Sequence, residues 1–403
     1  MDEESSQTEE TRSVGWLFLP SIVLSRLATT TPSIIMTLLL IEIGLTFGLP
    51  VGVTGQLSTA GSIASFVSAL IMGVLSVRYK HRSLLMIGLL IYSLSLLGRG
   101  LAPNFILFLL FSILGGLGGP MITPMTNTLV AKHLPLQKRT RVFGLLVAAA
   151  SFSWVIGFII IRFISDIGGW RFPFLVYALP LPLLGLLLAF KGLPPESGGS
   201  QTPSSTGSLI EGYRGVLSSR SADACLVCDA LSWAVWSGFT LYGASFYRQQ
   251  FLVSIGAVTY LLMGAATSFT LGALISNRFV NKFGRKPVTL VSALMIGLFV
   301  LFTTIVPNLW ISLALCLTGY LFMGLNSTAA TSLTIEQVPQ FRGTLMSMRS
   351  ASTSMSGVLG AGLGGLALLM YGYKALGPSL GLLGLASGVI MYLIVVDPTQ
   401  MQS

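Results

Sequence analysis

The sequence predicts an all-α membrane protein with 12 transmembrane helices in two pseudo-symmetric six-helix bundles. Three observations predict it: the composition, the regular spacing of long apolar runs, and loop motifs repeated across the midpoint. Of the 403 residues, 53% are hydrophobic and only 9% are charged, whereas a soluble globular protein carries about 25% charged residues. A surface this poor in charge excludes soluble enzymes and disordered proteins, so the chain lies in a membrane.

Twelve apolar runs follow one another along the chain, separated by short polar or Gly/Pro clusters. Each is long enough to cross a hydrocarbon core about 30 Å thick at a helical rise of about 1.5 Å per residue. Alternating segments of about ten residues, which are typical of a membrane barrel, are absent. The predicted spans are 16–38, 51–76, 83–101, 104–127, 142–165, 172–191, 223–247, 253–277, 287–306, 309–333, 343–370 and 374–396.

The distribution of Lys and Arg predicts the orientation. With the N-terminus inside, 16 of these residues fall in cytoplasmic segments and four (Arg99, Arg171, Arg248 and Lys374) in outer ones. Cytoplasmic loops of membrane proteins carry the excess of Lys and Arg. We therefore expect a multi-pass protein of the cell membrane with both termini in the cytoplasm. The net charge of +10 then reflects the basic cytoplasmic loops and does not indicate a surface that binds nucleic acid.

The composition divides the chain into five parts. Residues 1–15 are predicted as a disordered cytoplasmic tail, because they are acidic and polar, the reverse of a signal peptide. A first bundle covers 16–191 and a second covers 223–396, with a short tail at 397–403. The linker at 192–222 is rich in Gly, Ser and Pro, which is typical of a flexible tether.

The two halves repeat each other. The basic segment Arg78–Arg82 is matched by Lys282–Lys286 at an offset of 204 positions, and Leu134-Pro135 is matched by Val338-Pro339 at the same offset. Parallel repeats related by an axis along the membrane normal place a substrate site between them near the midplane.

These loops resemble those of the Major Facilitator Superfamily. Residues 73–82 meet the family's loop signature GxLxDRxGRR in part, and 277–286 form a second copy; the acidic position has become Val77 and Asn281. The resemblance implies a secondary transporter without cofactors. It also implies roles in conformational change for the following residues: Gly73, Arg78, Arg82, Gly284, Arg285 and Lys286.

Two further segments resemble the family and its drug:proton antiporter branch. Residues 168–174 resemble the family's turn between helices 5 and 6, and Pro194-Pro195-Glu196 resembles the end of helix 6 in that branch. The sequence departs from the branch at Ser112, where an Arg is expected, and at 157–162, where the helix 5 signature is reduced. The resemblance favours efflux. The departures argue against a proton-driven drug antiport mechanism.

Arg26 is the first candidate for binding substrate. It lies ten residues past Trp16, about 15 Å into the membrane. A charge at the centre of a spanning helix costs about 2.5–3.5 kcal/mol on insertion scales, so it is seldom without a role. A guanidinium suits a carboxylate or a phosphate. The alternatives are an arginine that extends to the headgroups or one that pairs with a structural acid.

The seventh span holds the other candidates. Asp229 lies at about the depth of Arg349 in the eleventh span, so the two can form an ion pair. In the functional interpretation Asp229 couples transport to protons and Arg349 binds substrate. In the structural interpretation the ion pair only fixes how the two helices pack. Trp233 and Trp236 can stack on a substrate or pack on lipid.

Five more residues complete the candidates. Asn326 in the tenth span has an amide side chain that can form hydrogen bonds with a substrate. Glu336, near the inner end of that span, is expected to meet a basic loop in one conformation, as part of a cytoplasmic gate. Glu42 is expected to be an exposed loop acid just outside the first span, and Arg162 with Asp166 a structural i,i+4 pair.

Motifs for other functions are absent. The sequence has no GxxxxGK[ST], HExxH or GxSxG in a plausible context. The CxxC at Cys225 and Cys228 lacks further ligands for zinc. We therefore expect no enzyme activity, no catalytic residue, no cofactor and no metal, with a small-molecule substrate, membrane lipid and, as an option, protons as partners of a monomer.

The sequence thus predicts a secondary active transporter that moves a small organic solute by alternating access. Two cations, Arg26 and Arg349, against one acid favour an anionic or zwitterionic solute. Efflux, with proton exchange as an option, is the first hypothesis. The alternatives are uptake or facilitated diffusion of an organic anion, and a non-transporting membrane sensor or a lipid scramblase or flippase.

Overall fold

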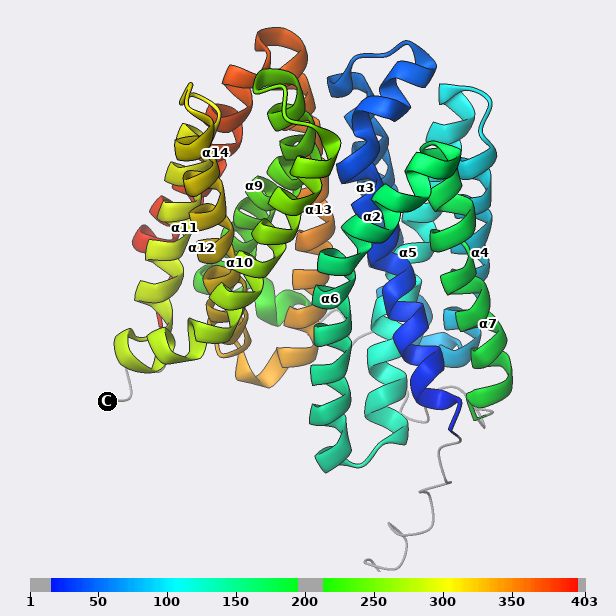
Figure 1. Ribbon diagram of the computed structural model, residues 1–403. Helices are drawn as coiled ribbons and strands as arrows, with labels where there is room; N and C mark the ends of the chain where they lie inside the picture. The colour runs from blue at the N-terminus through cyan, green and yellow to red at the C-terminus, as the bar shows by residue number, and fades with distance from the viewer. Residues whose placement is uncertain (1–15, 195–212, 398–403) are drawn as a thin grey trace, which may run out of the picture. The chain divides into compact units, whose positions relative to one another are not determined.

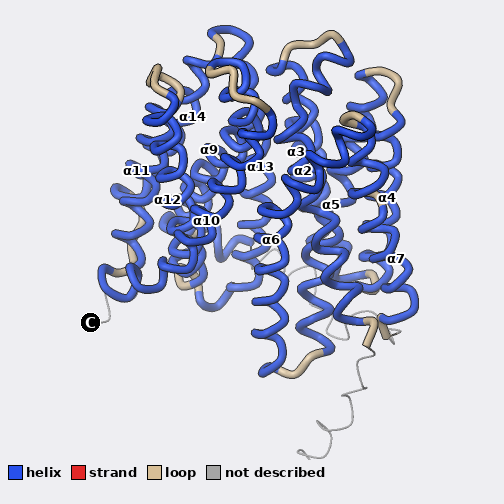
Figure 2. Tube along the Cα trace, viewed as in Figure 1, coloured by secondary structure: helices blue, strands red, loops and turns tan. Residues whose placement is uncertain are grey.

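The computed structural model describes residues 16–194 and 213–397. Within helices, the side chains at 73–74, 77–78, 136–137, 140 and 342–343 lie outside the described set. Every regular element in the described ranges is helical (Figure 2), and 12 helices there are long and apolar enough to cross a membrane. The predicted fold class is confirmed. The predicted tails and most of the predicted linker lie outside the described ranges.

Each predicted span contains a helix, and four of the helices run six to nine residues past a predicted end; Figure 1 shows the helices in chain order. Those before the linker are α2 (Phe18–Phe47), α3 (Val51–Arg78), α4 (His81–Leu101), α5 (Phe105–His133), α6 (Leu136–Gly168), the π-helix η1 (Pro173–Ala178) and α7 (Pro180–Gly192). Those after it are α9 (Arg220–Gln250), α10 (Ile255–Phe283), α11 (Arg285–Thr303), α12 (Leu309–Ile335), the 3₁₀ turn η2 (Pro339–Phe341), α13 (Arg342–Tyr371) and α14 (Tyr373–Leu393).

Helix α2 extends further than predicted. It continues to Phe47, so Glu42 lies inside a helix and the expectation of a loop acid is wrong. The helix contains Pro32, and its backbone leaves helical geometry at Leu39. The hydroxyl of Thr31, which precedes this proline, donates to the Leu27 carbonyl of the same helix.

The chain forms two compact units, and each is described by itself. One comprises Met1–Ile34 and Val67–Pro203; the other comprises Ile35–Phe66 and Ser204–Ser403. The second unit therefore includes the end of α2 and the beginning of α3. Gly55 on α3 makes this packing possible, because a Cβ there would collide with the ring of Tyr242 on α9.

The two units contain similar contacts, at an offset about one helical turn longer than the 204 positions of the loop repeat. In the first unit the hydroxyl of Ser68 donates to the carbonyl of Leu117, at 2.8 Å. In the second unit Ser276 donates to the carbonyl of Leu325, at 3.1 Å. Both members of the second pair lie 208 positions after their counterparts. The same helix pair of each half is therefore joined in the same way.

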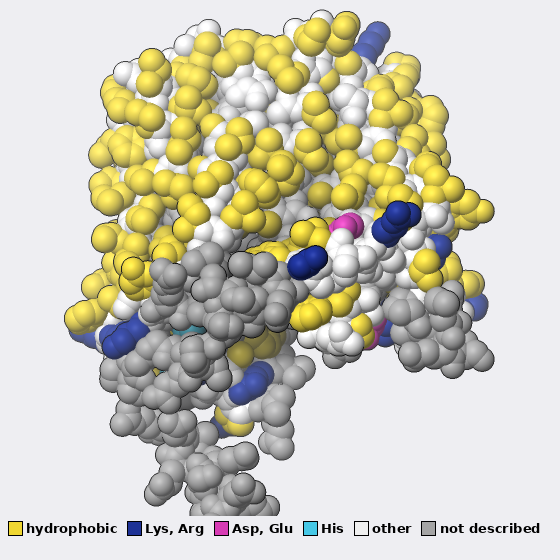
Figure 3. Space-filling model, turned by 180° about the vertical axis from the view of Figure 1, so that it is seen from behind, with side chains coloured by type: hydrophobic (Ala, Val, Ile, Leu, Met, Phe, Trp, Pro, Cys, Tyr) yellow, Lys and Arg dark blue, Asp and Glu magenta, His cyan; other side chains and the backbone are white. Residues whose placement is uncertain are grey.

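The surface is apolar over most of the face drawn in Figure 3. Large hydrophobic side chains such as Phe163, Leu274 and Tyr392 are about two-thirds exposed, at 67%, 70% and 67%. Exposing such an apolar surface to water is unfavourable, whereas contact with the hydrocarbon of a membrane is not. The protein is a multi-pass membrane protein.

Candidate functional site

The first unit holds a polar group around Arg26. Arg26 lies eight residues after the start of α2 at Phe18, about 12 Å along the helix. Its Nη1 donates to Oγ1 of Thr123 on α5, at 2.6 Å. No acidic side chain pairs with it in the described part of the chain. Arg26 is thus a half-buried cation without a counter-ion there, and sequence reasoning did not identify Thr123 as its partner.

Hydroxyl groups follow Arg26 along α2. Thr30, one turn beyond Arg26, donates to a carbonyl of its own helix and lies 3.3 Å from the hydroxyl of Ser153 on α6. Thr29 donates its hydroxyl to the Arg26 carbonyl, and the Thr29 carbonyl accepts from Tyr92 on α4. The hydroxyls of Thr29 and Thr30 are thus engaged within α2, and the guanidinium is the group here that can bind an anion.

The second unit holds the predicted ion pair. Nη2 of Arg349 on α13 donates to Oδ1 of Asp229 on α9, at 3.0 Å. The Asp229 side chain is 0% exposed and the Arg349 side chain 14%. Oδ2 of Asp229 and Nε of Arg349 are buried without a hydrogen bond in the described structure. The pair is therefore buried and incompletely satisfied, which is costly in a packed interior.

Aromatic side chains follow Asp229 along α9. The rings of Trp233 and Trp236 meet edge to face at 5.2 Å, and both are half-buried. Phe269 on α10 joins them, with its centroid 6.5 Å from Trp233 and 6.1 Å from Trp236. Sequence reasoning missed Phe269, because nothing in its local sequence distinguishes it from other apolar residues of α10.

Asn326 lies in packing between helices. It is 1% exposed, and its Nδ2 donates to the Thr289 carbonyl on α11, at 3.1 Å. Its Oδ1 makes no hydrogen bond in the described structure. The donor of this amide is thus occupied by a neighbouring helix, while the predicted contact with substrate remains a prediction.

Two of the predicted gating residues bind equivalent places in the two units. Nη2 of Arg82 donates to the Phe190 carbonyl near the end of α7, and Nζ of Lys286 lies 3.4 Å from the Tyr392 carbonyl near the end of α14. Arg82 and Lys286 are 204 positions apart in the sequence. Cations are favoured where helix carbonyls lack partners, so both residues stabilise a helix end.

The other predicted gating residues are placed as follows. Gly284 joins α10 to α11 with φ +90°, a conformation that favours glycine. Nη1 of Arg285 is buried without a hydrogen bond in the described structure, and Glu336 is the C-terminal cap of α12. Gly73 and Arg78 lie in α3 among residues whose side chains are outside the described set. A gating role for these residues remains a prediction.

Sequence reasoning missed an ion pair in the second unit. Nη1 and Nη2 of Arg248, near the end of α9, donate to the two carboxylate oxygens of Glu42 on α2, at 3.1 and 2.6 Å. This bidentate geometry is the stronger form of an arginine–carboxylate contact. It joins residues 206 positions apart, so no local pattern could predict it.

No metal site is formed in the residues that the structure describes. Groups of three or more His, Cys, Asp or Glu side chains suited to a metal ion do not occur among them. Cys225, Cys228 and Cys316 are free and buried. The described side chains instead offer the unpaired cation of Arg26, the buried ion pair of Asp229 and Arg349, and an aromatic cluster, all within spanning helices.

This combination of 12 candidate spanning helices with charges buried inside them is that of a multi-pass membrane protein. The chain belongs to the Major Facilitator Superfamily, whose profile matches residues 19–270 and 226–403. That assignment confirms the predicted superfamily; it does not single out the drug:proton antiporter branch.

Three bacterial relatives resemble parts of the chain. A niacin transporter of Acinetobacter baylyi is 29% identical over 41% of this chain and 36% of its own length. A cis,cis-muconate transport protein of the same organism is 23% identical over 58% of each chain. A probable sugar efflux transporter of Pasteurella multocida is 27% identical over 62% of this chain and 60% of its own. Each match spans less than two thirds of the relative.

A solved structure shows the same fold. The D-xylose–proton symporter superimposes with a TM-score of 0.78 over 96% of this chain and 99% of that one, at 15% identity. This likeness supports the helical architecture. Its substrate is a property of that protein.

Proposed function

We propose that this chain is a secondary transporter of small organic carboxylates and that Arg26 binds the carboxylate group. The observation that carries the proposal is the half-buried guanidinium of Arg26, which contacts a threonine hydroxyl and pairs with no acid among the described side chains. Transport by alternating access requires such a site inside the membrane.

The energetic argument concerns the missing counter-ion. A cation held within a membrane-spanning helix costs about 2.5–3.5 kcal/mol on insertion scales. A carboxylate would remove much of this cost through a charge-assisted, bidentate contact. The hydroxyl of Thr123, which accepts from Arg26, can donate its own proton to the bound carboxylate. Niacin and cis,cis-muconate, the solutes in the names of two relatives, are both carboxylates, which supports this substrate class.

Coupling to protons is assigned to Asp229 in this proposal. Its carboxylate accepts a hydrogen bond from Arg349, so taking up a proton would weaken the ion pair and free Arg349. For direction we propose export, with both termini in the cytoplasm. The efflux function in the name of one relative supports the export direction.

The test uses purified protein in proteoliposomes with radiolabelled nicotinate or cis,cis-muconate. We expect exchange of label against the same unlabelled solute, lost in Arg26→Ala and partly kept in Arg26→Lys. Arg162→Ala is the matched control, because Arg162 has its own acid, Asp166, one turn away. It should exchange like the wild type.

Other results would separate the alternatives. Equal exchange in wild type and Arg26→Ala would contradict the role of Arg26. Binding of solute without exchange would indicate a sensor, and movement of fluorescent lipid across the bilayer would indicate a scramblase or flippase. Imposed pH gradients should drive uptake into inverted vesicles for wild type and not for Asp229→Asn; a gradient-driven response in that variant would remove Asp229 from coupling.

A further inference from the structure

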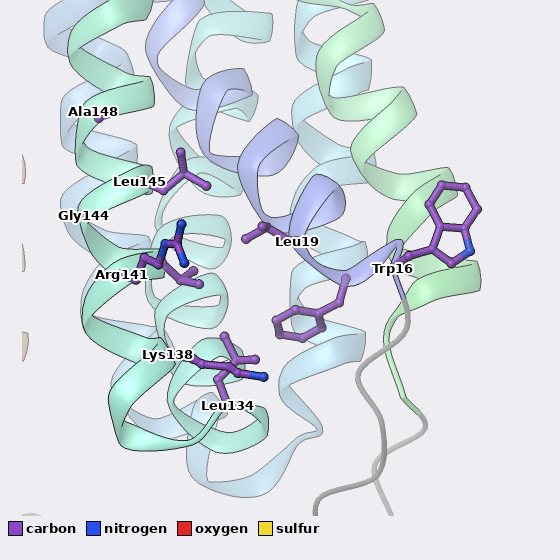
Figure 4. A pocket seen from close by; sticks show the side chains of 10 residues that line it. Trp16, Leu19, Leu134, Lys138, Arg141, Gly144, Leu145 and Ala148 are labelled. Atoms are coloured by element: carbon purple, nitrogen blue, oxygen red, sulfur yellow. The ribbon is translucent and has the colours of Figure 1, made fainter.

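A large pocket opens in the first unit between the beginnings of α2 and α6. Its volume is about 850 Å³, which lies in the range of small-molecule sites. Apolar side chains form most of its wall, chiefly Phe18, Leu19, Leu134, Val142 and Leu145. Figure 4 shows Leu19 on α2 and Leu145 on α6 pointing toward one another across it.

Two cations stand at the pocket on the side of α6. Lys138 and Arg141 line it, and both side chains extend from α6 toward α2 in Figure 4. Neither makes a hydrogen bond or an ion pair with a described side chain. No acid occurs in the first turn of α6, and Pro135 provides no side-chain cap. The positive end of the helix dipole and two unpaired cations therefore lie together, an arrangement that an anion would stabilise.

The pocket lies at the level where the membrane ends. The apolar run that the sequence predicts as a span begins at residue 142 of α6, and Ala148, also in the lining, lies six residues further, about 9 Å along the helix. Trp16, at the beginning of α2, is 84% exposed, and exposed tryptophans are typical of the headgroup region. The cations thus lie at headgroup depth and the apolar wall at acyl-chain depth.

We propose that this pocket binds an anionic phospholipid of the adjoining leaflet, with its phosphate at Lys138 and Arg141 and an acyl chain against Leu19 and Leu145. A small soluble anion would use the cations but leave the apolar wall bare, whereas a neutral lipid would use only the wall. Basic pockets between transmembrane helices are known to hold anionic headgroups. The site is separate from Arg26 and does not depend on the proposed substrate.

Native mass spectrometry of the full chain in detergent tests the proposal with dioleoyl-phosphatidylglycerol as probe. We expect one tightly bound lipid in the wild type, with weaker binding of dioleoyl-phosphatidylcholine. Each Lys or Arg near an anionic headgroup contributes about a fivefold change in affinity, so Lys138→Gln with Arg141→Gln should weaken binding about thirtyfold. Arg214→Gln with Arg220→Gln is the matched control, because it removes two exposed cations elsewhere and should leave binding unchanged.

A second variant tests the apolar part of the pocket. Gly144 lines it, and a Cβ built there meets nothing within 4 Å. Gly144→Leu should therefore fill the pocket without a clash, and leucine is also the better helix former. We expect loss of the tightly bound phosphatidylglycerol, with the melting temperature in lipid-free detergent kept.

Four results would overturn the proposal. One is equal binding of phosphatidylglycerol and phosphatidylcholine. A second is phosphatidylglycerol binding that survives Gly144→Leu, and a third is binding that falls equally in the charge variant and its control. The fourth is binding of glycerol 3-phosphate as tight as that of the lipid, which would make the pocket a site for soluble phosphates.

Discussion

The ion pair between Asp229 and Arg349 allows a quantitative test of the second unit. At 3.0 Å and an effective dielectric constant of about 20, the attraction is about 5–6 kcal/mol. Desolvation of the two groups offsets most of it, so the pair as a whole stabilises little. Removing one partner is different, because the other charge stays buried, and the expected cost is about 3–5 kcal/mol.

The perturbations are Asp229→Asn, Arg349→Gln and the double variant. Each single substitution should lower the free energy of unfolding by about 3–5 kcal/mol, and the double variant should lose less than the sum of the two. Arg349→Gln should cost more than Asp229→Asn, because it leaves a carboxylate that is 0% exposed instead of a guanidinium that is 14% exposed. Unfolding in mixed micelles by increasing sodium dodecyl sulfate measures the free energy of unfolding of the purified wild type and of the three variants.

The pair of Arg162 and Asp166 on α6 provides a matched control cycle. Its side chains are 29% and 53% exposed, and an exposed i,i+4 pair contributes about 0.3–0.5 kcal/mol. The coupling energy between Asp229 and Arg349 should be several times larger than that between Arg162 and Asp166. Equal coupling in the two cycles would refute the reasoning, because it would mean that the Asp229 pair lies in solvent.

Three other predictions concern the second unit. Glu42→Gln and Arg248→Gln should show a coupling of about 1 kcal/mol in a double-mutant cycle, between the values for exposed and buried pairs; additive effects would contradict the bidentate contact. Gly360→Leu should destabilise by about 1–3 kcal/mol as measured by detergent unfolding, because a Cβ there meets the α9 backbone. Cys225 and Cys228 should react with a maleimide only after denaturation, since both are buried; rapid labelling of the folded protein would contradict their burial.

Much of the fold follows from local sequence. The ends of α4, α5 and α12 lie within a few residues of the predicted spans except at the C-terminus of α5, because apolar length and terminal Gly, Pro or Asn residues determine where a spanning helix begins and ends. The end of α2 was missed, since the polar residues at Glu42 and Thr46 resemble the start of a loop. The helical conformation at Glu42 is accompanied by an ion pair with Arg248, which is distant in the sequence, and Thr46 donates to the Glu42 carbonyl.

The candidate site was predictable in part for the same reason. Charges inside apolar spans, such as Arg26 and Asp229, are visible in the sequence because they are rare there. Their surroundings are not visible: Thr123 and Phe269 are ordinary residues of apolar helices, and only packing brings them to Arg26 and Trp233.

The sequence by itself determined that this protein crosses the membrane 12 times, repeats itself and carries charges within its spans, because hydrophobicity, length and charge are properties of consecutive residues. The tertiary structure alone decided which charges have partners. Asp229 pairs with Arg349, and Glu42 pairs with Arg248. Arg26, Lys138 and Arg141 pair with no acid among the described side chains. The physical reason is that an ion pair is set by distance in space, over 120 or 206 positions of sequence, and helix packing determines that distance.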